Sequence, residues 1–368
     1  MTTLPRPAAP LASADPAAAA RSGPPSTAAS ADRKADHIRL ALDERMQLGR
    51  SYFDDWRLPH AALPEIDRAA IDLEVDFLGK RLSAPLLISC MTGGTEIASR
   101  INRNLARAAE TAGIAVGVGS QRRALEDAAT AGTFEVRDDA PTTVLLANLG
   151  AVQLNYGFGL AECRRAVEMI GADALVLHLN PLQEAIQPEG QCDFSGLLDK
   201  MGEIAAGLGV PVIAKEVGNG ISGELAAALA ERGIAIVDTA GLGGTSWSRI
   251  EAARAGDAEL GEVFAGWGIP TPESIRQCRR VPGVIVIGSG GVRNGVDVAR
   301  AIALGADLAG MAFPFLAAAT RSPEEVVAKI ERTVEELKIA MFCTGARTVA
   351  ELKRAPIEPV PSRERNPP

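Results

Sequence analysis

The sequence has few cysteines, and no two of them form a C-x-x-C pair. Five are spread over 368 residues, at Cys90, Cys163, Cys192, Cys278 and Cys343. An odd number of widely spaced cysteines in a long chain argues against a disulfide framework and predicts a protein of the reducing cytoplasm. The spacing also gives no support to a structural zinc site.

The chain also lacks a surplus of basic residues and any long apolar run. Lys plus Arg number 38 against 46 Asp plus Glu, a net charge of −8, which disfavours a nucleic-acid-binding protein. Phosphate binding would then need a local cluster of cations and backbone amides. No stretch stays apolar for the about 18 residues of a membrane span. Residues 1–30 are rich in Ala and Pro and lack a compact apolar segment, so we expect a disordered tail rather than a signal peptide.

What the sequence does contain is a repeat of short apolar runs from Pro85 onward. They alternate with amphipathic stretches and comprise Pro85–Cys90, Ile114–Gly117, Thr143–Asn148, Ala174–Leu179, Pro211–Lys215, Ala235–Asp238, Val284–Ile287 and Leu308–Met311. Continuous apolar runs are typical of parallel strands buried on both faces. Eight strand–helix units in about 250 residues predict a (β/α)₈ TIM barrel, placed here over 85–350; a doubly wound open sheet is the rival architecture. We expect an arm over 31–84, helical over Arg33–Met46, and a C-terminal tail over 351–368.

The predicted strands end in glycines and polar residues, at the edge of a barrel where active sites lie. Gly290 and Gly291, after the seventh run, would let backbone amides approach an anion, and the following helix would add its N-terminal dipole. Arg293 could add a charge-assisted hydrogen bond. We therefore predict a phosphate cradle there, although the same glycines taken alone would indicate only a tight turn.

The fourth run carries the densest polar group, with His178, Asn180, Gln183 and Glu184 within seven positions. A lone histidine in an apolar strand is more often a core residue, but this density at a barrel rim favours a functional site. Glu184 is a candidate Mg²⁺ ligand, because Mg²⁺ is commonly held by one or two carboxylates and substrate phosphates. Lys215, at the end of the fifth run, should face either a ligand or a carboxylate such as Glu216 or Asp238.

Several strings together resemble the type 2 isopentenyl-diphosphate isomerases, the flavin-dependent form of that enzyme. The resemblance covers about Arg33 to Ala346 and rests on RKADHI at 33–38, MTGG at 91–94, GSQR at 119–122, ANLGA at 147–151, HLNPLQE at 178–184, KEVGNG at 215–220, GLGGTSW at 241–247 and GSGGVR at 288–293. The HLNPLQE string is highly specific, whereas the glycine-rich strings are shared more widely among FMN-binding barrels.

The resemblance implies an FMN-dependent barrel that is active with reduced FMN, with NADPH as the reductant. Its cofactor-binding residues would be Met91, Thr92, Gly93, Ser120, Asn148, Lys215, Thr245, Gly290, Gly291, Arg293, Met311 and Ala312. The substrate diphosphate would be held by Arg33, Lys34, Arg122, His178 and Asn180. His178 and Gln183 would be catalytic, Glu184 would bind Mg²⁺, and Trp247 and Trp56 would wall the prenyl pocket. The family further implies a homotetramer or homo-octamer.

The implied reaction is the isomerisation of isopentenyl diphosphate to dimethylallyl diphosphate in isoprenoid biosynthesis, without net redox change. An unactivated alkene is a weak base, and an electron-rich reduced flavin would stabilise the positive charge that develops on protonation. Gln183 is a poor acid, so it should orient or relay rather than supply the proton. One alternative is an FMN-dependent oxidoreductase acting on a small hydroxy acid, with His178 as base and Arg122 as carboxylate ligand. A non-catalytic flavin or phosphate sensor is a second alternative.

Overall fold

The eight apolar runs form one closed barrel of parallel strands. This computed structural model describes residue 34 and residues 36–361; the predictions for residues 1–30 and Arg33 lie outside that part of the chain. The strands are β4 (Leu86–Ile88), β5 (Ala115–Gly117), β6 (Leu145–Gly150), β7 (Ala174–Leu179), β8 (Val212–Glu216), β9 (Ile236–Asp238), β10 (Ile285–Ser289) and β11 (Leu308–Met311). They pair in chain order, and β11 closes the ring onto β4. The predicted barrel is confirmed, and the open sheet is excluded.

Residues along each strand alternate between two cores. Leu87, Ala115 and Ile213 belong to the core inside the barrel, whereas Leu86 and Val116 pack between the barrel and the surrounding helices. Because both faces are buried, each strand is a continuous apolar run in the sequence. A hairpin of β2 (Val75–Phe77) and β3 (Lys80–Leu82) adds Phe77 and Leu82 to the inner core.

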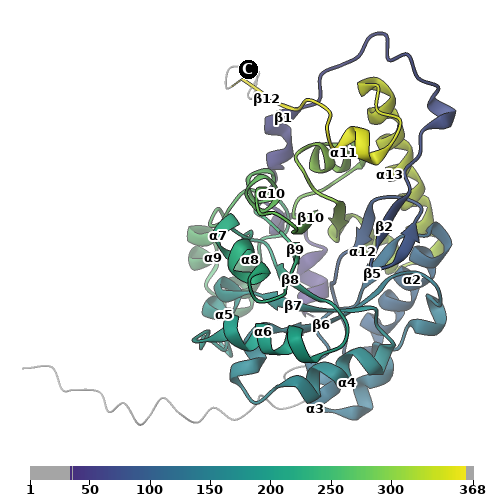
Figure 1. Cartoon of the computed structure of the whole chain (residues 1–368). Helices are drawn as coiled ribbons and strands as arrows, with labels where there is room; N and C mark the ends of the chain where they lie inside the picture. The colour runs from purple at the N-terminus through teal and green to yellow at the C-terminus, as the bar shows by residue number, and fades with distance from the viewer. Residues whose placement is uncertain (1–33, 35, 362–368) are drawn as a thin grey trace, which may run out of the picture.

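Helices follow the strands and surround the barrel (Figure 1). They are α2 (Glu96–Ala112), α3 (Arg122–Glu126), α4 (Leu160–Ile170), α5 (Pro181–Ile186), α6 (Leu197–Gly207), α7 (Gly223–Ala230), α8 (Trp247–Ala255), α9 (Ala258–Phe264), α10 (Thr271–Arg279), α11 (Gly295–Ala303), α12 (Phe313–Ala319), α13 (Pro323–Thr344) and α14 (Val349–Leu352). The longest, α13, begins at the side-chain cap of Ser322 and ends at Gly345 in a left-handed conformation, the usual chemistry of a helix start and stop. Over the described residues, no helix combines the length and apolar character needed to cross a bilayer.

The arm is less helical than the sequence predicts. It is helical over 36–41, after which Asp43 caps a short 3₁₀ turn, η2 (Glu44–Met46), and Ser51 caps a second, η3 (Tyr52–Asp55). Side chains that cap turns compete with a continuous helix. Strand β1 (Trp56–Arg57) then pairs antiparallel with β12 (Glu358–Pro359), so the described part of the C-terminal tail joins the arm.

Candidate active site

A cavity of about 450 Å³ opens at the C-terminal ends of the barrel strands. All eight strands or the loops after them contribute to its wall, and the arm covers part of it. Most of the site residues predicted from the sequence line this one cavity: Lys34, Met91, Thr92, Ser120, Arg122, Asn148, His178, Asn180, Gln183, Glu184, Lys215, Thr245, Trp247, Gly290, Gly291, Arg293 and Ala312.

Three predicted residues do not reach the cavity wall. Met311 is 1% exposed and belongs to the core between barrel and helices, because alternate residues of a strand face opposite sides and its neighbours Gly310 and Ala312 take the inner positions. Gly93 lies directly against the ring of Phe134. Trp56 instead lies under the guanidinium of Arg276, 5.0 Å from its ring centroid. None of the three therefore lines the cavity as the structure describes it, and the cofactor-binding roles of Gly93 and Met311 stay predictions.

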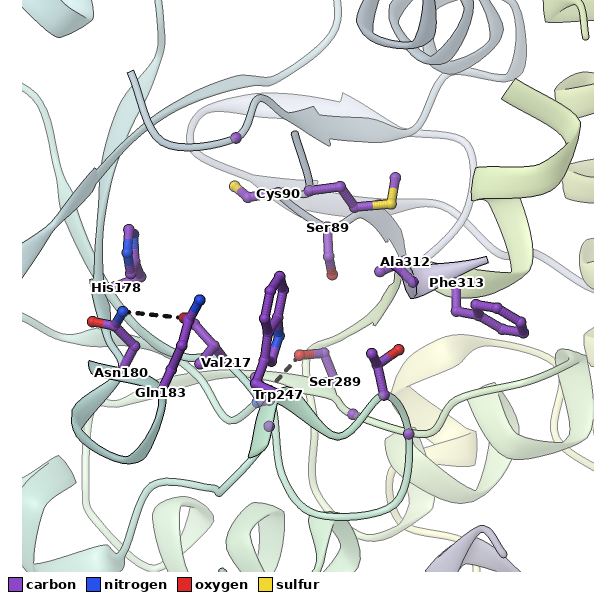
Figure 2. Close-up of a pocket in the computed structure, with 18 of the residues that line it drawn as sticks. Ser89, Cys90, His178, Asn180, Gln183, Val217, Trp247, Ser289, Ala312 and Phe313 are labelled. Atoms are coloured by element: carbon purple, nitrogen blue, oxygen red, sulfur yellow. Dashed lines mark hydrogen bonds between the residues drawn. The ribbon is translucent and has the colours of Figure 1, made fainter. Parts of the chain in front are cut away.

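The polar residues after β7 form one hydrogen-bonded cluster. The Asn180 amide nitrogen donates to Gln183 Oε1 at 3.1 Å and to Glu184 Oε1 at 2.9 Å. Figure 2 shows the first of these bonds, with Gln183 and Trp247 rising toward the open centre of the cavity. The other Glu184 oxygen accepts from the Gln191 backbone amide at 2.7 Å and from the Gln187 side chain at 3.2 Å. Glu184 is thus a held, 8% exposed carboxylate at the cavity wall.

A buried carboxylate from a helix distant in sequence holds the side-chain amide of Gln183 in place. Glu251, on α8, has a completely buried side chain and accepts from Gln183 Nε2 at 2.7 Å and from Arg254 Nη1 at 2.6 Å. His37 Nε2 of the arm lies 2.9 Å from the same carboxylate, and its ring meets Trp247 edge-on. Burial alone would raise the pKa of Glu251, but the bonds from His37, Gln183 and Arg254 lower it to about 2. An ionised Glu251 therefore sets which way the Gln183 amide points.

His178 is held as a neutral imidazole beside Asn148. Its Nδ1 lies 2.8 Å from Asn148 Oδ1. Burial, with the nearby charges of Lys34 and Lys215, lowers the pKa of His178 to about 3. At neutral pH the ring therefore carries one proton, which the Asn148 carbonyl oxygen places on Nδ1.

Lys215 faces both a possible ligand site and a carboxylate, the two alternatives that the sequence left open for it. It lines the cavity while only 7% exposed, donates to the Glu216 carbonyl at 2.8 Å, and lies 3.6 Å from the buried carboxylate of Asp238. Ser289 Oγ also donates to Asp238. The ammonium is therefore paired on its protein side and faces the cavity on the other.

The loops after β9 and β10 are glycine-rich because their backbones touch. A Cβ on Gly290 would clash with the carbonyl oxygen of Gly241, and one on Gly291 with that of Gly243. Both Gly290 and Gly291 have positive φ angles, of 102° and 71°, which favour glycine. Within the described chain, neither of their amides donates to another backbone carbonyl. The predicted cradle thus has free donors at the cavity wall.

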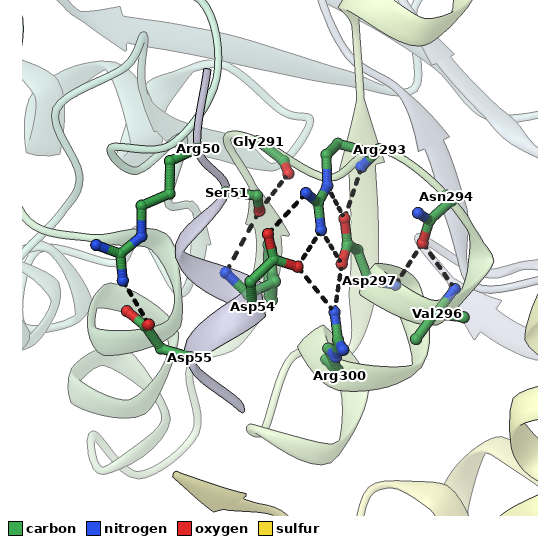
Figure 3. A network of polar contacts seen from close by, with 11 residues as sticks. Arg50, Ser51, Asp54, Asp55, Gly291, Arg293, Asn294, Val296, Asp297 and Arg300 are labelled. Atoms are coloured by element: carbon green, nitrogen blue, oxygen red, sulfur yellow. Dashed lines mark hydrogen bonds and ion pairs between the residues drawn. The ribbon is translucent and has the colours of Figure 1, made fainter. Parts of the chain in front are cut away.

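Arg293 is engaged elsewhere than the sequence predicts. Its guanidinium bonds Asp54 of the arm at 2.6 and 2.9 Å and Asp297 of α11 at 2.7 Å, and Arg300 also reaches Asp297 (Figure 3). Asp297 is completely buried. These bonds raise the pKa of Arg293 and lower that of Asp54. The side chain therefore ties the arm to the barrel instead of offering free donors to an anion.

The helix that follows β10 is also less open than predicted. Asn294 caps the amides of residues 296 and 297 at the start of α11, and Glu336 takes the amide of Gly295. By contrast, Ala312, the residue before α12, makes no side-chain cap at the start of that helix after β11. The free amides at this end of the barrel thus come from the glycine loop and from the start of α12.

Several contacts of the site could not be predicted from the sequence. Glu251 stands in none of the strings that carry the resemblance, His37 stands in RKADHI without a role of its own, and only the fold brings the two together beside Gln183. Gln191 is a third case: its side-chain oxygen accepts from Arg122 at 3.0 Å and from Gln153 at 2.8 Å. Gln121, in the GSQR string, is completely buried and pairs with the backbone of residue 148.

Comparison with known proteins first identifies the class of protein to which this chain belongs. A profile for the FMN-dependent dehydrogenase family matches residues 38–148 and 198–359, more than half of the chain. Mandelate oxidase with (S)-2-phenylpropionate superposes with a TM-score of 0.62 at 19% identity, covering 90% of this chain and 98% of that one; at this identity the likeness shows the fold alone. The protein is an FMN-dependent dehydrogenase-type barrel.

Relatives of much higher identity narrow the assignment. Isopentenyl-diphosphate delta-isomerase of Nostoc sp. is 51% identical over 341 residues, covering 90% of this chain and 97% of its own. The isopentenyl-diphosphate delta-isomerase of Methanothrix thermoacetophila is 50% identical over 332 residues, covering 88% and 92%. The chain belongs to the family of the isopentenyl-diphosphate delta-isomerases.

Proposed function

We propose that this protein converts isopentenyl diphosphate to dimethylallyl diphosphate with the help of reduced FMN. The observation that carries the proposal is that one cavity joins the glycine cradle after β10 to the held Gln183–Glu184 pair after β7. About 50% identity to isopentenyl-diphosphate isomerases over nearly the whole chain supports this choice of substrate. The likeness to mandelate oxidase, at 19% identity, gives no comparable support for hydroxy-acid oxidation.

The cavity fits FMN on the observations above. The phosphate would lie on the free amides of Gly290 and Gly291 and on the uncapped start of α12, where backbone dipoles favour an anion. Thr92, Ser120, Asn148, Lys215 and Thr245 would hold the ring system. When bound, reduced FMN would supply an electron-rich surface that stabilises positive charge and exchanges the reacting proton.

The protein's own residues would position the substrate and exclude water from it. Lys34 and Arg122 line the cavity and would bind the diphosphate. Neutral His178 has its Nδ1 proton fixed by Asn148, which leaves Nε2 to meet the substrate. Gln183, held by Glu251 through its Nε2, would present its amide to the allylic carbons. Trp247 lines the same cavity and would exclude water from the prenyl group.

Glu184 fits the requirements of a Mg²⁺ ligand. It is a hard oxygen donor at the cavity wall, held in place by three hydrogen bonds. Over the described ranges no three His, Cys, Asp or Glu side chains cluster to form a metal cage. Since Mg²⁺ keeps several waters and binds one or two carboxylates plus substrate phosphates, the diphosphate would bring the ion to Glu184.

The remaining expectations concern the reductant, the assembly and the compartment. We propose NADPH as the source of electrons, a homotetramer or homo-octamer, and a cytoplasmic location. The five cysteines are all unpaired, as in a reducing compartment. Val263, on α9, and Trp267, three residues after its end, are 69% and 63% exposed. Light scattering of the FMN-loaded protein would measure the assembly directly.

The proposed activity is tested against hydroxy-acid oxidation in one anaerobic comparison. The protein with FMN, Mg²⁺ and dithionite is given isopentenyl diphosphate, and oxidised protein is given mandelate or lactate. Many turnovers per flavin with the first substrate and no flavin reduction by the second support the proposal. Flavin reduction by a hydroxy acid, without isomerisation, would overturn it.

A further inference from the structure

One of the cavity arginines has no counter-charge. Among the residues that the structure describes, four arginines line the cavity. Arg50 pairs with Asp55, Arg122 with Glu126, and Arg293 with two carboxylates. The fourth, Arg123, forms no ion pair with any residue the structure describes. Its Nε and Nη1 atoms are buried and bond to nothing in that part of the chain.

An arginine in this state is costly for the folded protein. The residue is half-buried, but two of its three guanidinium nitrogens are buried without a hydrogen-bond partner among the described residues, which is unfavourable for donors of a charged group. An anionic ligand that completes the pair would recover this cost on binding. The planar fork of arginine matches a phosphate group in particular, through two parallel hydrogen bonds.

Arg123 lies on a different side of the cavity mouth from Arg122. Its stem packs beside Gly94, in the loop after β4, where an added Cβ would come within 3.1 Å of Arg123 Cδ. Gly94 has a φ of 83° and is held there by a bond from its amide to Thr133. Arg122 instead reaches Gln191, beyond β7. Successive residues of a helix point about 100° apart, so the two arginines serve two separate positions.

We propose that Arg123 binds a phosphate-type anion on the β4–β5 side of the cavity mouth. The anion is either the diphosphate of the substrate or a phosphate of the nicotinamide dinucleotide that reduces the flavin. This inference rests on the proposed function for its choice of ligands. Its first experiment, with inorganic diphosphate, nevertheless gives a result whether or not the protein turns over isopentenyl diphosphate.

The test compares Arg123→Met with Arg103→Met, which removes the same charge from an exposed position of α2. Calorimetry measures the binding of inorganic diphosphate to each FMN-loaded protein, and stopped flow measures anaerobic flavin reduction at limiting NADPH. We expect Arg123→Met to weaken one of these by about tenfold or more, as for a lost charged hydrogen bond, and Arg103→Met to change neither. Weaker diphosphate binding identifies the substrate as the source, and slower reduction identifies the dinucleotide.

Stability distinguishes a ligand-binding arginine from a structural one. Without added anions, Arg123→Met should melt at the same temperature as the parent protein or higher, because it removes two buried donors that have no partner among the described residues. A lower melting temperature, unchanged diphosphate binding and flavin reduction, or a loss confined to FMN affinity would each overturn the proposal. As a second variant, Arg123→Lys keeps the charge without the fork and should lose part of the same affinity.

Discussion

Replacing Glu251 by glutamine tests whether this buried carboxylate orients the side chain of Gln183. The carboxylate is completely buried, accepts from Gln183 and Arg254, and has His37 Nε2 2.9 Å away. In Glu251→Gln one oxygen becomes an NH₂ group that faces a donor, and Arg254 loses a buried counter-charge. Breaking a buried ion pair costs about 3–5 kcal/mol. Arg254 keeps its bond to Glu189, so we expect the lower end, about 3 kcal/mol.

The pH dependence gives an independent check of the same magnitude. Lowering the pKa of Glu251 from 4.5 to about 2 corresponds to about 3 kcal/mol of stability. The unfolded carboxyl takes up its proton first, so this contribution is complete above pH 4.5 and is lost as the pH falls toward 2. Glu251→Gln should lack this part of the stability profile.

Chemical unfolding of FMN-loaded protein between pH 3 and 7 is the assay, together with turnover at pH 7. The matched control is Glu262→Gln, on the adjoining helix, whose side chain is 62% exposed and pairs with Arg249; it should cost under about 1 kcal/mol. Turnover of Glu251→Gln should fall by up to about 100-fold, because the Gln183 amide loses its orientation. If Glu251→Gln matches Glu262→Gln in both stability and turnover, the reasoning is refuted.

The remaining predictions concern the arm, the metal and the cradle. Asp297→Asn should destabilise the protein by about 3 kcal/mol and make the arm more sensitive to limited proteolysis, since its buried carboxylate holds two arginines; unchanged proteolysis would contradict the role given to the arm. Glu184→Gln should lower activity and weaken its Mg²⁺ dependence while FMN stays bound, as Mg²⁺ titrations and flavin absorbance would measure; normal activity would remove Glu184 from the site. Gly291→Ala should lower the ratio of bound FMN to protein, because its Cβ would strike the Gly243 carbonyl. Gly283→Ala, also at positive φ but with open space around it, should retain FMN.

The barrel was predictable because its strands are buried on both faces. The run Ala174–Leu179 coincides with β7, and Leu308–Met311 with β11. The gathering of Asn180, Gln183 and Glu184 at one cavity follows from the same rule, since barrel loops meet at the C-terminal strand ends.

What the sequence could not show is how side chains from distant segments pair. Arg293 is typical of a phosphate ligand until Asp54, more than 200 positions earlier, is found on its guanidinium. Met311 was predicted to bind the cofactor at the end of the run Leu308–Met311, yet side chains of a strand alternate between two faces, and that of Met311 points away from the cavity. Glu251 belongs to no motif and matters only because α8 packs behind Gln183.

The central claim is that the protein moves a double bond by proton exchange without consuming its flavin. It is tested by proton NMR in D₂O under anaerobic conditions, with FMN, Mg²⁺, dithionite and isopentenyl diphosphate. We predict dimethylallyl diphosphate in many-fold excess over flavin, with deuterium in the product. Bound flavin with no isomerised product, or a product free of deuterium, would contradict the account.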